Sequence, residues 1–439
     1  MRIAILGAGI TGLTIGYQLA RRAPEWDFVL FERSDRVGGL LKSEQRAGFT
    51  WDTAGGHILY TRDPALRRHL WDRLGGAVVE SRRQTRIYYH GRYVNYPFEN
   101  GLGDLSPEDN FRCLRGYVNA YLAREKGTAP RPSSLREWIY WRFGDGIAES
   151  FMIPYNEKIW KSDLRDMSFD WVADRVPDAP PDDVIRSAVG IRTEGYTHQL
   201  QFGYPLRGGM QALADATAAP IRDRIRLATP VAHVRGRAGR WEVNGDRFDR
   251  VVSTLPLRGV PDLLDGMDPA AAAAARALEY VHVLCFLVGL DHPGRVPYSW
   301  VYLPHPENGP VNRLTHLGNY SPGNCPAGHS SVMCEVTFRG DRPPDPEATL
   351  AALLARLEEA EVLDRRRVAA TAWSRADHAY AYHGRDFPAN IARVRAYLDG
   401  IGFDTCGRTG RMEYFNTDHC VAAAFAYVER LVATGRPGR

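Results

Sequence analysis

The sequence contains almost no lysine. Lysine stands at only four positions, so nearly all of the 56 basic residues are arginine, and the net charge at neutral pH is +4. A charge excess this small gives no reason to expect nucleic acid as a partner. Because arginine is so common, an arginine becomes a candidate for function only where a motif surrounds it.

Paired cysteines and long apolar runs are also missing. The six cysteines form no CxxC motif, which argues against a zinc site or a disulfide framework and fits a reducing compartment. No apolar run reaches the ~20 residues of a membrane-spanning helix, and the first residues enter a strand directly, leaving no room for a signal peptide. We therefore expect a cytoplasmic protein without metal or membrane contact, as a monomer or homo-oligomer.

A glycine-rich turn stands close to the N-terminus. Gly7-Ala8-Gly9-Ile10-Thr11-Gly12 follows a short apolar run at 2–6 and precedes a helical pattern at 13–23. The first glycine permits a tight turn, the second lets the backbone approach a pyrophosphate, and the third lets helix and strand pack closely. The phosphates would lie at the helix N-terminus, which favours anions.

An acidic residue completes this pattern. A second predicted strand at 27–31 ends in Glu32, where a carboxylate accepts hydrogen bonds from an adenosine ribose. The strand, glycines, helix, second strand and acid occur in this order within 32 residues, which makes the motif far stronger than a lone GxGxxG. The sequence predicts a dinucleotide-binding unit.

The residues after Glu32 favour FAD over NAD. Arg33 to Leu40 contain the pair Gly38-Gly39, which resembles the extended dinucleotide motif of the amine-oxidase-like flavoproteins, where such a pair lies near the FAD pyrophosphate. Segments 251–256 and 407–424 are similar to later parts of the same proteins. The resemblance implies a discontinuous FAD domain built from the start, middle and end of the chain.

A further series of segments, in order, resembles UDP-galactopyranose mutase, and the eukaryotic-type enzymes more than the short bacterial ones. These segments are Gly55-Gly56-His57-Ile58-Leu59-Tyr60, Asn95-Tyr96-Pro97-Phe98-Glu99-Asn100, Pro154-Tyr155-Asn156-Glu157-Lys158-Ile159-Trp160, Phe202 to Gly209, Trp300 to Pro304, Arg313 to Pro322 and Asn416-Thr417-Asp418-His419. Together with the FAD motifs they extend over nearly the whole chain.

The resemblance implies an α/β fold in three parts. We expect a discontinuous Rossmann-like FAD-binding domain, a mainly helical substrate domain as an insertion, and an antiparallel β-sheet domain that also contacts substrate. The expected bounds are 1–95, 208–265 and 385–435 for the first, 100–195 for the second, and 196–207 and 280–384 for the third.

The resemblance also implies a reaction. In that family N5 of reduced FAD attacks the anomeric carbon of a nucleotide diphosphate sugar, and the sugar ring changes between its pyranose and furanose forms without net redox change. The expected partner is thus a nucleotide diphosphate sugar. NAD(P)H is a candidate reductant for the flavin, and with no second GxGxxG it would share the sugar-nucleotide pocket.

Several residues acquire expected roles from their place in these segments. Arg175 and Arg313 fall where the family holds the diphosphate, for which the fork of arginine is suited, and His57 falls on the mobile loop over the flavin. Tyr302, Tyr380 and Tyr414 match tyrosines at the diphosphate and sugar. The residues expected at the cofactor are Gly7, Gly9, Thr11, Gly12, Glu32, Arg33, Gly39, Leu40, Gly56, His57, Arg408, Asn416, Thr417 and Asp418.

The nucleotide base is expected between aromatic and amide groups. These candidates are Phe98, Glu99, Tyr155, Asn156, Trp160 and Gln199. The chain departs from the family here, because Glu99 stands where the family has Gln, and Gln199 roughly where eukaryotic-type members have Asn. A carboxylate only accepts hydrogen bonds, so Glu99 suits a base with more donors, such as guanine or cytosine, and leaves base and sugar open.

Two other functions compete with this hypothesis. A redox enzyme of the amine-oxidase or protoporphyrinogen-oxidase type shares the FAD architecture but leaves the two arginines and the segment Pro154 to Trp160 unexplained. A non-catalytic sugar-nucleotide binding protein that retains FAD is disfavoured by the intact flavin-contact motifs.

Overall fold

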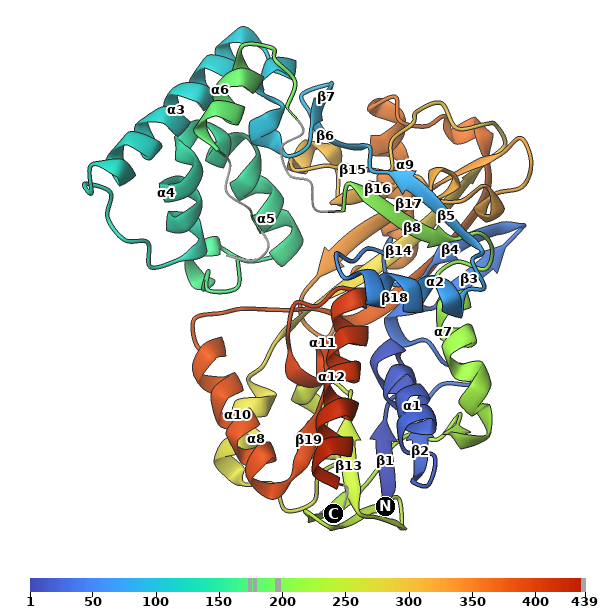
Figure 1. Cartoon of the computed structure of the whole chain (residues 1–439). Coiled ribbons are helices and arrows are strands. Elements are labelled where there is room, and N and C mark those ends of the chain that lie inside the picture. The colour runs from blue at the N-terminus through green and yellow to red at the C-terminus, as the bar shows by residue number, and fades with distance from the viewer. Residues whose placement is uncertain (173–175, 177–179, 194–198, 436–439) are drawn as a thin grey trace.

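The computed structural model describes residues 1–172, 176, 180–193 and 199–435. Figure 1 shows a parallel sheet with its helices at the bottom, a larger mixed sheet at the upper right and a group of helices at the upper left. The predicted α/β fold class is confirmed, while the predicted domain bounds stay a prediction. Within the described part of the chain, no helix is both long and apolar enough to cross a bilayer.

A five-stranded parallel sheet forms the lower part, in the order β19-β13-β1-β2-β9. Its strands are β1 (Arg2–Leu6), β2 (Asp27–Phe31), β9 (Ile225–Arg226), β13 (Arg250–Ser253) and β19 (Phe403–Thr405). These strands come from the beginning, the middle and the end of the chain. The central strands β1 and β2 have the near-continuous apolar sequence that is typical of parallel strands buried on both faces.

Alternate residues of β1 enter two different cores. Ile3 and Ile5 pack with helices α1 (Ile10–Arg22), α7 (Gln211–Ala218) and α12 (Thr417–Gly435). Ala4 and Leu6 pack against the opposite layer. That layer contains α8 (Pro269–Arg276), α10 (Phe387–Ile401) and the small sheet of β10 (Val234–Arg237), β11 (Arg240–Val243) and β12 (Asp246–Phe248). The two-residue period of a strand thus directs side chains into both layers.

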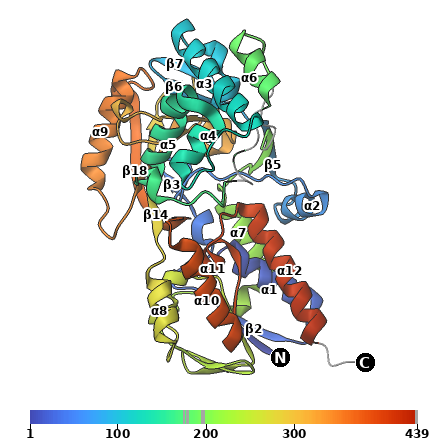
Figure 2. The ribbon, with the colours of Figure 1, turned by 90° about the vertical axis from the view of Figure 1, so that its left-hand side faces the viewer.

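A seven-stranded mixed sheet forms the upper right part, in the order β18-β14-β17-β16-β15-β6-β7. Its strands are β6 (Thr85–Tyr89), β7 (Arg92–Asn95), β14 (Tyr280–Leu290), β15 (Trp300–Tyr302), β16 (Arg313–Thr315), β17 (Ser330–Phe338) and β18 (Val368–Ala381). All neighbours are antiparallel except β15 and β6. Helix α9 (Pro346–Glu359) covers one face, as Figure 2 shows.

The other face of this sheet turns toward the FAD motifs. The hairpin of β3 (Ser43–Arg46) and β4 (Phe49–Asp52) places Phe49 and Trp51 against Cys285 and Met333. A two-stranded ribbon of β5 (Val78–Arg82) and β8 (Gln201–Pro205) and helix α2 (Pro64–Arg73) complete this side. Side chains of β17 that share the face of Met333 therefore point toward the site and not toward α9.

The helical part contains α3 (Pro107–Glu125), α4 (Leu135–Ile147), α5 (Ile153–Trp160) and α6 (Pro181–Ala188). Ser106 and Ser134 cap α3 and α4 by accepting a backbone N–H three residues ahead, a favoured arrangement at helix N-termini. A π-helical turn (Ala148–Met152) joins α4 to α5. Ile139, Phe143 and Ile147 form part of the core of these helices. Helix α5 packs beside β17, where Thr337 donates to the carbonyl of Lys158.

Candidate active site

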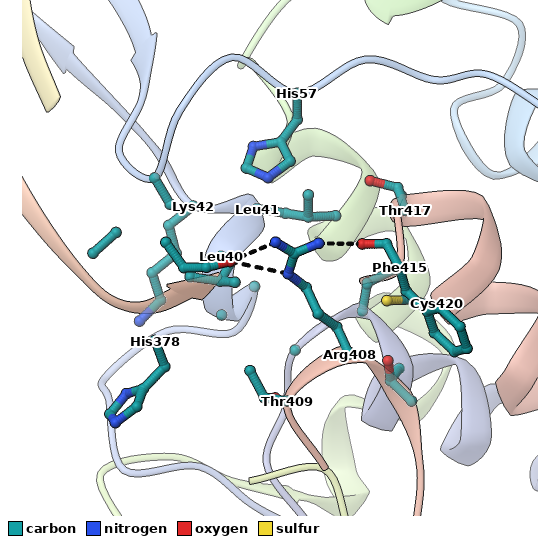
Figure 3. Close-up of a pocket in the computed structure, with 18 of the residues that line it drawn as sticks. Leu40, Leu41, Lys42, His57, His378, Arg408, Thr409, Phe415, Thr417 and Cys420 are labelled. Atoms are coloured by element: carbon teal, nitrogen blue, oxygen red, sulfur yellow. Dashed lines mark hydrogen bonds between the residues drawn. The ribbon is translucent and has the colours of Figure 1, made fainter. Parts of the chain in front are cut away.

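A cavity of about 880 Å³ extends from the carboxyl edge of the parallel sheet to the mixed sheet. It is lined by residues from the N-terminal glycine turn, from residues 53–60, from β18 and from the segment around α11 (Gly407–Arg411) and α12 (Figure 3). The volume lies in the range of small-molecule and cofactor sites. Segments far apart in the sequence are thus brought to one cavity.

The glycine turn has little space for side chains. A Cβ on Gly12 would lie 2.0 Å from the carbonyl oxygen of Gly7, so strand and helix pack with no room for even a methyl group. Gly7 has φ +99°, which other residues rarely adopt. The backbones of Gly9 and Gly39 meet across the cavity floor, where a Cβ on Gly39 would lie 3.1 Å from the Cα of Gly9.

The N-terminus of α1 faces the cavity. Its N-cap is Gly9, and no side chain among the described residues caps it by a hydrogen bond. The first N–H groups of a helix lack intrahelical partners and attract anions. This end of the cavity therefore fits a pyrophosphate.

Glu32 is held in place by two backbone N–H groups. Ala8 donates to Oε2 and Ser34 donates to Oε1, each at 3.0 Å. Glu32 is buried but lines the cavity, and the remaining lone pairs of its carboxylate can accept from ribose hydroxyls. Lys42 lies beside it and donates to the hydroxyl of Ser34 at 2.8 Å. The glycine turn, the uncapped helix and this oriented acid fit FAD.

The loop that carries His57 starts at a buried carboxylate. Asp52 is fully buried and accepts from Ser43 Oγ (2.6 Å), from the hydroxyl of Tyr204 (3.0 Å) and from the N–H of Met210 (3.2 Å). Burial raises the pKa of Asp52 to about 6, although these hydrogen bonds and the backbone N–H of His57 oppose the shift. Asp52 thus ties β3, β8 and the start of α7 to the histidine loop.

His57 points into the cavity from this loop (Figure 3). Burial, followed by the positive charges of Arg313 and Arg408, lowers its pKa to about 4, so the imidazole is neutral at neutral pH. Its Nδ1 has no hydrogen-bond partner among the described residues. Buried polar atoms are normally satisfied, so this nitrogen fits a cavity that holds a bound group.

Arg313 and Glu335 form an ion pair at the wall of the cavity. The register of β16 and β17 places them directly opposite each other. Nε and Nη2 of Arg313 lie 2.8 and 2.7 Å from Glu335 Oε1, and Glu335 is only 1% exposed. Burial by itself lowers the pKa of Arg313, but the carboxylate more than offsets this and keeps it well above the ordinary value. A fixed positive charge therefore faces the cavity.

Two tyrosines form a wall beside this arginine. Tyr380 of β18 and Tyr414, which follows α11, stack with ring centroids 5.8 Å apart. The guanidinium of Arg408 lies over both rings and donates to the carbonyl oxygens of Ala379 and Phe415. Trp160 of α5 contacts both tyrosines edge-on or tilted. Arg408 therefore holds the tyrosine wall as well as lining the cofactor cavity.

A second row of aromatic rings leads into the helical part. Phe98 stacks on Phe151, Phe151 stacks on Tyr155, and Tyr155 meets the cavity residue Tyr302 edge to face. Asn156 accepts from Trp160 Nε1 at 3.1 Å and donates to a backbone carbonyl. Tyr155 and Asn156 thus support the wall of the site from α5.

Glu99 lies deeper in the helical part. It is 5% exposed, and burial raises its pKa to about 7, opposed by its own backbone N–H and by the charge of Arg142 on α4. It does not belong to the described lining of the cavity. Its expected role at the base stays a prediction.

The predicted site residues divide into three groups. Those that line the cavity are Gly7, Gly9, Thr11, Glu32, Arg33, Gly39, Leu40, Gly56, His57, Gln199, Tyr302, Arg313, Tyr380, Arg408, Tyr414, Asn416 and Thr417. Those that do not line the described cavity are Gly12, Phe98, Glu99, Tyr155, Asn156, Trp160 and Asp418. Arg175 lies outside the described residues.

Some residues of the site have no counterpart in the sequence-based prediction. Asp52 anchors the histidine loop, and Glu335 anchors Arg313. In the sequence, the only local indication of either residue is an acid at an inward position of an apolar strand. His378 lies in an irregularity of β18 with φ +59°, and its backbone N–H donates to Nδ1 of His282 at 3.2 Å. Such bulges often shape sites, but the sequence does not reveal them.

Comparison with known proteins identifies one family, and the relatives found include two kinds of porphyrinogen oxidase. Residues 10–395 match the family described as flavin containing amine oxidoreductase. The coproporphyrinogen III oxidase of Mycobacterium tuberculosis is 26% identical over 445 residues, covering 93% of this chain and 95% of that protein. Protoporphyrinogen oxidase 2 of Arabidopsis thaliana is 22% identical over 307 residues, covering 60% of this chain and 58% of that protein.

Solved structures show the same fold. The crystal structure of a reduced UDP-galactopyranose mutase superposes with a TM-score of 0.90 at 24% identity, covering 99% of this chain and 96% of that chain. A putative protoporphyrinogen oxidase from Exiguobacterium sp. 255-15 superposes with a TM-score of 0.73 at 20% identity, covering 99% of both chains. The architecture is therefore that of an FAD-binding amine-oxidase-like protein.

Proposed function

Because the chain belongs to the flavin containing amine oxidoreductase family, whose fold binds FAD, we propose that it is an FAD-dependent isomerase of nucleotide diphosphate sugars. In this proposal it interconverts the pyranose and furanose forms of the sugar, as UDP-galactopyranose mutase does. The bond between C1 and the diphosphate oxygen breaks, the ring opens and recloses on another hydroxyl oxygen, and the C1–O bond reforms. No electrons are gained or lost overall.

Bound reduced FAD supplies the nucleophilic N5 atom for the anomeric carbon. The residues of the chain bind and orient the reactants around it. Arg313 retains the departing nucleotide diphosphate, and Tyr380 and Tyr414 position the sugar. Neutral His57 presents Nδ1 beside the reacting groups. Arg175 is proposed as the second diphosphate arginine.

The observation that carries this proposal is the orientation of Arg313. Its guanidinium is partly buried, with 20% of the side chain exposed, is held by Glu335, and faces a cavity that Tyr302, Tyr320 and Tyr380 also line. A departing diphosphate must stay bound to return, and a fixed arginine fork suits that task. The superposition on the reduced mutase, with a TM-score of 0.90, supports it as a likeness of fold.

A second candidate function is porphyrinogen oxidation. The observation that favours it is the 26% identity to coproporphyrinogen III oxidase across 93% of the chain. The carboxylates of a porphyrinogen could also pair with Arg313. In that case FAD would accept electrons from the substrate and pass them to oxygen, and peroxide would accumulate with product.

One paired experiment separates the two. Dithionite-reduced, FAD-loaded protein is incubated without oxygen with UDP-galactofuranose, and the nucleotide sugars are separated by chromatography. Conversion to the pyranose without consumption of reductant supports the isomerase. Protein with oxidised FAD, free of dithionite, is given coproporphyrinogen III in air. Peroxide formed in proportion to porphyrin, with no ring conversion of UDP-, GDP-, CDP- or TDP-linked sugars, would overturn the proposal in favour of the oxidase.

The proposal also includes a reductant for the flavin. We propose NAD(P)H as the electron donor, entering the same cavity, because the sequence has a single glycine-rich dinucleotide motif. Reduction of bound FAD by NADPH or NADH under anaerobic conditions, followed at the flavin absorbance band, tests this. Saturation of the rate with NAD(P)H and its inhibition by UDP would support a shared pocket.

A further inference from the structure

Glu335 connects two parts of the site through one oxygen atom. Its Oε1 accepts from Nε of Arg313 at 2.8 Å and from the backbone N–H of Gly56 at 3.2 Å. Arg313 Nη2 lies 2.7 Å from the same oxygen and also donates to the carbonyl of Gly56 at 3.4 Å. Arginine, carboxylate and the residue before His57 therefore form one closed set of contacts.

We propose that Glu335 is a positioning residue that couples anion binding at Arg313 to the conformation of the histidine loop. This inference rests on the proposed function, because it assigns the anion at Arg313 to the diphosphate of the sugar nucleotide. It adds a second link to the direct contact between Arg313 and the carbonyl of Gly56. An anion that moves Arg313 must also shift the carboxylate to which Gly56 is bound.

The geometry leaves one edge of Arg313 for an anion. Nε and Nη2 are directed at Glu335, while Nη1 makes no hydrogen bond with the described residues. Arg313 lines the cavity, so this edge is available to a diphosphate oxygen. Charge-assisted bonds of this kind are strong and directional, and Glu335 determines which edge is presented.

The loop is built to fit against this carboxylate. Gly55 has φ +102°, and a Cβ there would lie 3.2 Å from Glu335 Oε2 and 3.5 Å from Arg313 Nη2. A side chain at this position would push the loop away from the ion pair. The glycine therefore allows the contact between Gly56 and Glu335 Oε1.

Two variants of Glu335 separate position from charge. Glu335→Asp keeps the charge but withdraws the carboxylate by one methylene, whereas Glu335→Gln keeps the length and one acceptor oxygen but loses the charge. We measure pyrophosphate affinity by calorimetry on FAD-loaded protein and hydrogen exchange of a peptide containing Gly56. Neither readout depends on turnover, and Glu335→Gln preserves side-chain volume if the shorter variant folds poorly.

We expect both readouts to move together in Glu335→Asp. Pyrophosphate affinity should fall about 30-fold or more, the scale for losing a hydrogen bond to a charged group, and exchange at Gly56 should rise. Glu335→Gln should lose only about fivefold, the scale of one weakened hydrogen bond. A charge-only role predicts the reverse order, because removing a negative charge would strengthen anion binding.

A control and a reciprocal test come from the same neighbourhood. Thr337→Val alters the same face of β17 by breaking the bond to the carbonyl of Lys158, and it should leave both readouts as in the wild type. Asp52→Asn loosens the anchor of the histidine loop, so exchange around His57 should rise and, because coupling is reciprocal, pyrophosphate affinity should fall. Loss of affinity in Thr337→Val would show a general disturbance, and unchanged affinity in Asp52→Asn with a loosened loop would overturn the coupling.

The failures of the two proposals are distinguishable. Wild-type protein that binds neither pyrophosphate nor UDP would overturn the proposed function, and the coupling with it. Wild-type protein that binds them, together with Glu335→Asp protein whose affinity or Gly56 exchange remains at the wild-type level, would overturn the coupling alone. Joint loss of both properties in Glu335→Asp supports it.

Discussion

Tyr380 and Tyr414 stack at an interplanar angle of 20°, although one belongs to β18 and the other follows α11. The guanidinium of Arg408 lies 5.3 Å from the first ring centroid and 4.9 Å from the second. The same arginine is bound to backbone carbonyls on both sides. Arg408 thus joins the C-terminal segment to the mixed sheet at the place where the two candidate sugar contacts meet.

Replacing Arg408 by lysine should loosen this wall. Lysine keeps the charge but lacks the planar fork that reaches two carbonyls and covers two rings. We expect the free energy of unfolding to fall by roughly 2 kcal/mol, the scale of a lost hydrogen bond to a charged group, and nucleotide-sugar affinity to fall as well. Urea unfolding and calorimetry measure the two effects.

Arg411→Lys provides the matched control. Arg411 lies on the same short helix, and its side chain pairs with Glu413 in a partly exposed position. Exposed pairs contribute little to stability, so this variant should resemble the wild type. Equal losses in both variants would show that the effect belongs to α11 as a whole and not to the tyrosine wall.

Arg313→Lys should separate sugar-nucleotide binding from cofactor binding. Lysine can still neutralise Glu335, so no unpaired buried charge is left, but it cannot clamp a diphosphate with a fork. We expect FAD content at the wild-type level and UDP affinity lowered about 30-fold or more, as for a truncated charge contact. Flavin absorbance and calorimetry are the measurements. Arg375→Lys, at another arginine of the cavity lining, should bind UDP normally, and near-normal UDP binding in Arg313→Lys would remove the diphosphate assignment.

Gly9→Ala should lose FAD without unfolding the protein. A Cβ at Gly9 meets only the Cα of Gly39, at 3.9 Å, so the protein itself tolerates the methyl group. The methyl would instead occupy the space predicted for the pyrophosphate. We expect a low ratio of flavin to protein absorbance together with an unchanged melting temperature of the FAD-free protein. Full FAD occupancy would contradict the assignment of this turn.

The cofactor end of the site could be predicted from the sequence because its parts are local. A single unit of strand, turn, helix and strand contains Gly7, Gly9 and Glu32. Their spacing predicts a dinucleotide-binding role without any knowledge of the fold. The structure brings all three to the cavity. The roles of Arg313 and Tyr414 could be predicted only from the resemblance to a family, because nothing in the local sequence distinguishes them from other arginines and tyrosines.

The supporting carboxylates could not be predicted in the same way. Asp52 accepts from Tyr204, 152 residues away, and Glu335 accepts from Gly56, 279 residues away. Such contacts depend on how three separate sheets and ribbons meet, and a local window of sequence carries no information about that. The sequence therefore predicts the residues that face the cofactor better than the residues that hold them.

The burial of Glu99 predicts how the stability of the protein depends on pH. Burial raises its pKa from 4.5 to about 7, so the folded protein binds a proton that the unfolded chain releases between these values. The free energy of unfolding should therefore decrease as the pH rises from 4.5 through 7. The size of this contribution is roughly 3 kcal/mol at most, at about 1.4 kcal/mol per pKa unit.

Glu99→Gln should remove this pH dependence. Glutamine has no proton to lose, so the variant should be more stable than the wild type at pH 8 and similar to it at pH 5, as measured by urea unfolding at both values. The affinities of both proteins for UDP, GDP, CDP and TDP test the predicted role of Glu99 at the base. A preference that moves from GDP or CDP toward UDP in the variant would show that this carboxylate contacts the base, and an unchanged order would contradict that role. Equal stability of the two proteins at pH 8 would contradict the buried, proton-binding acid.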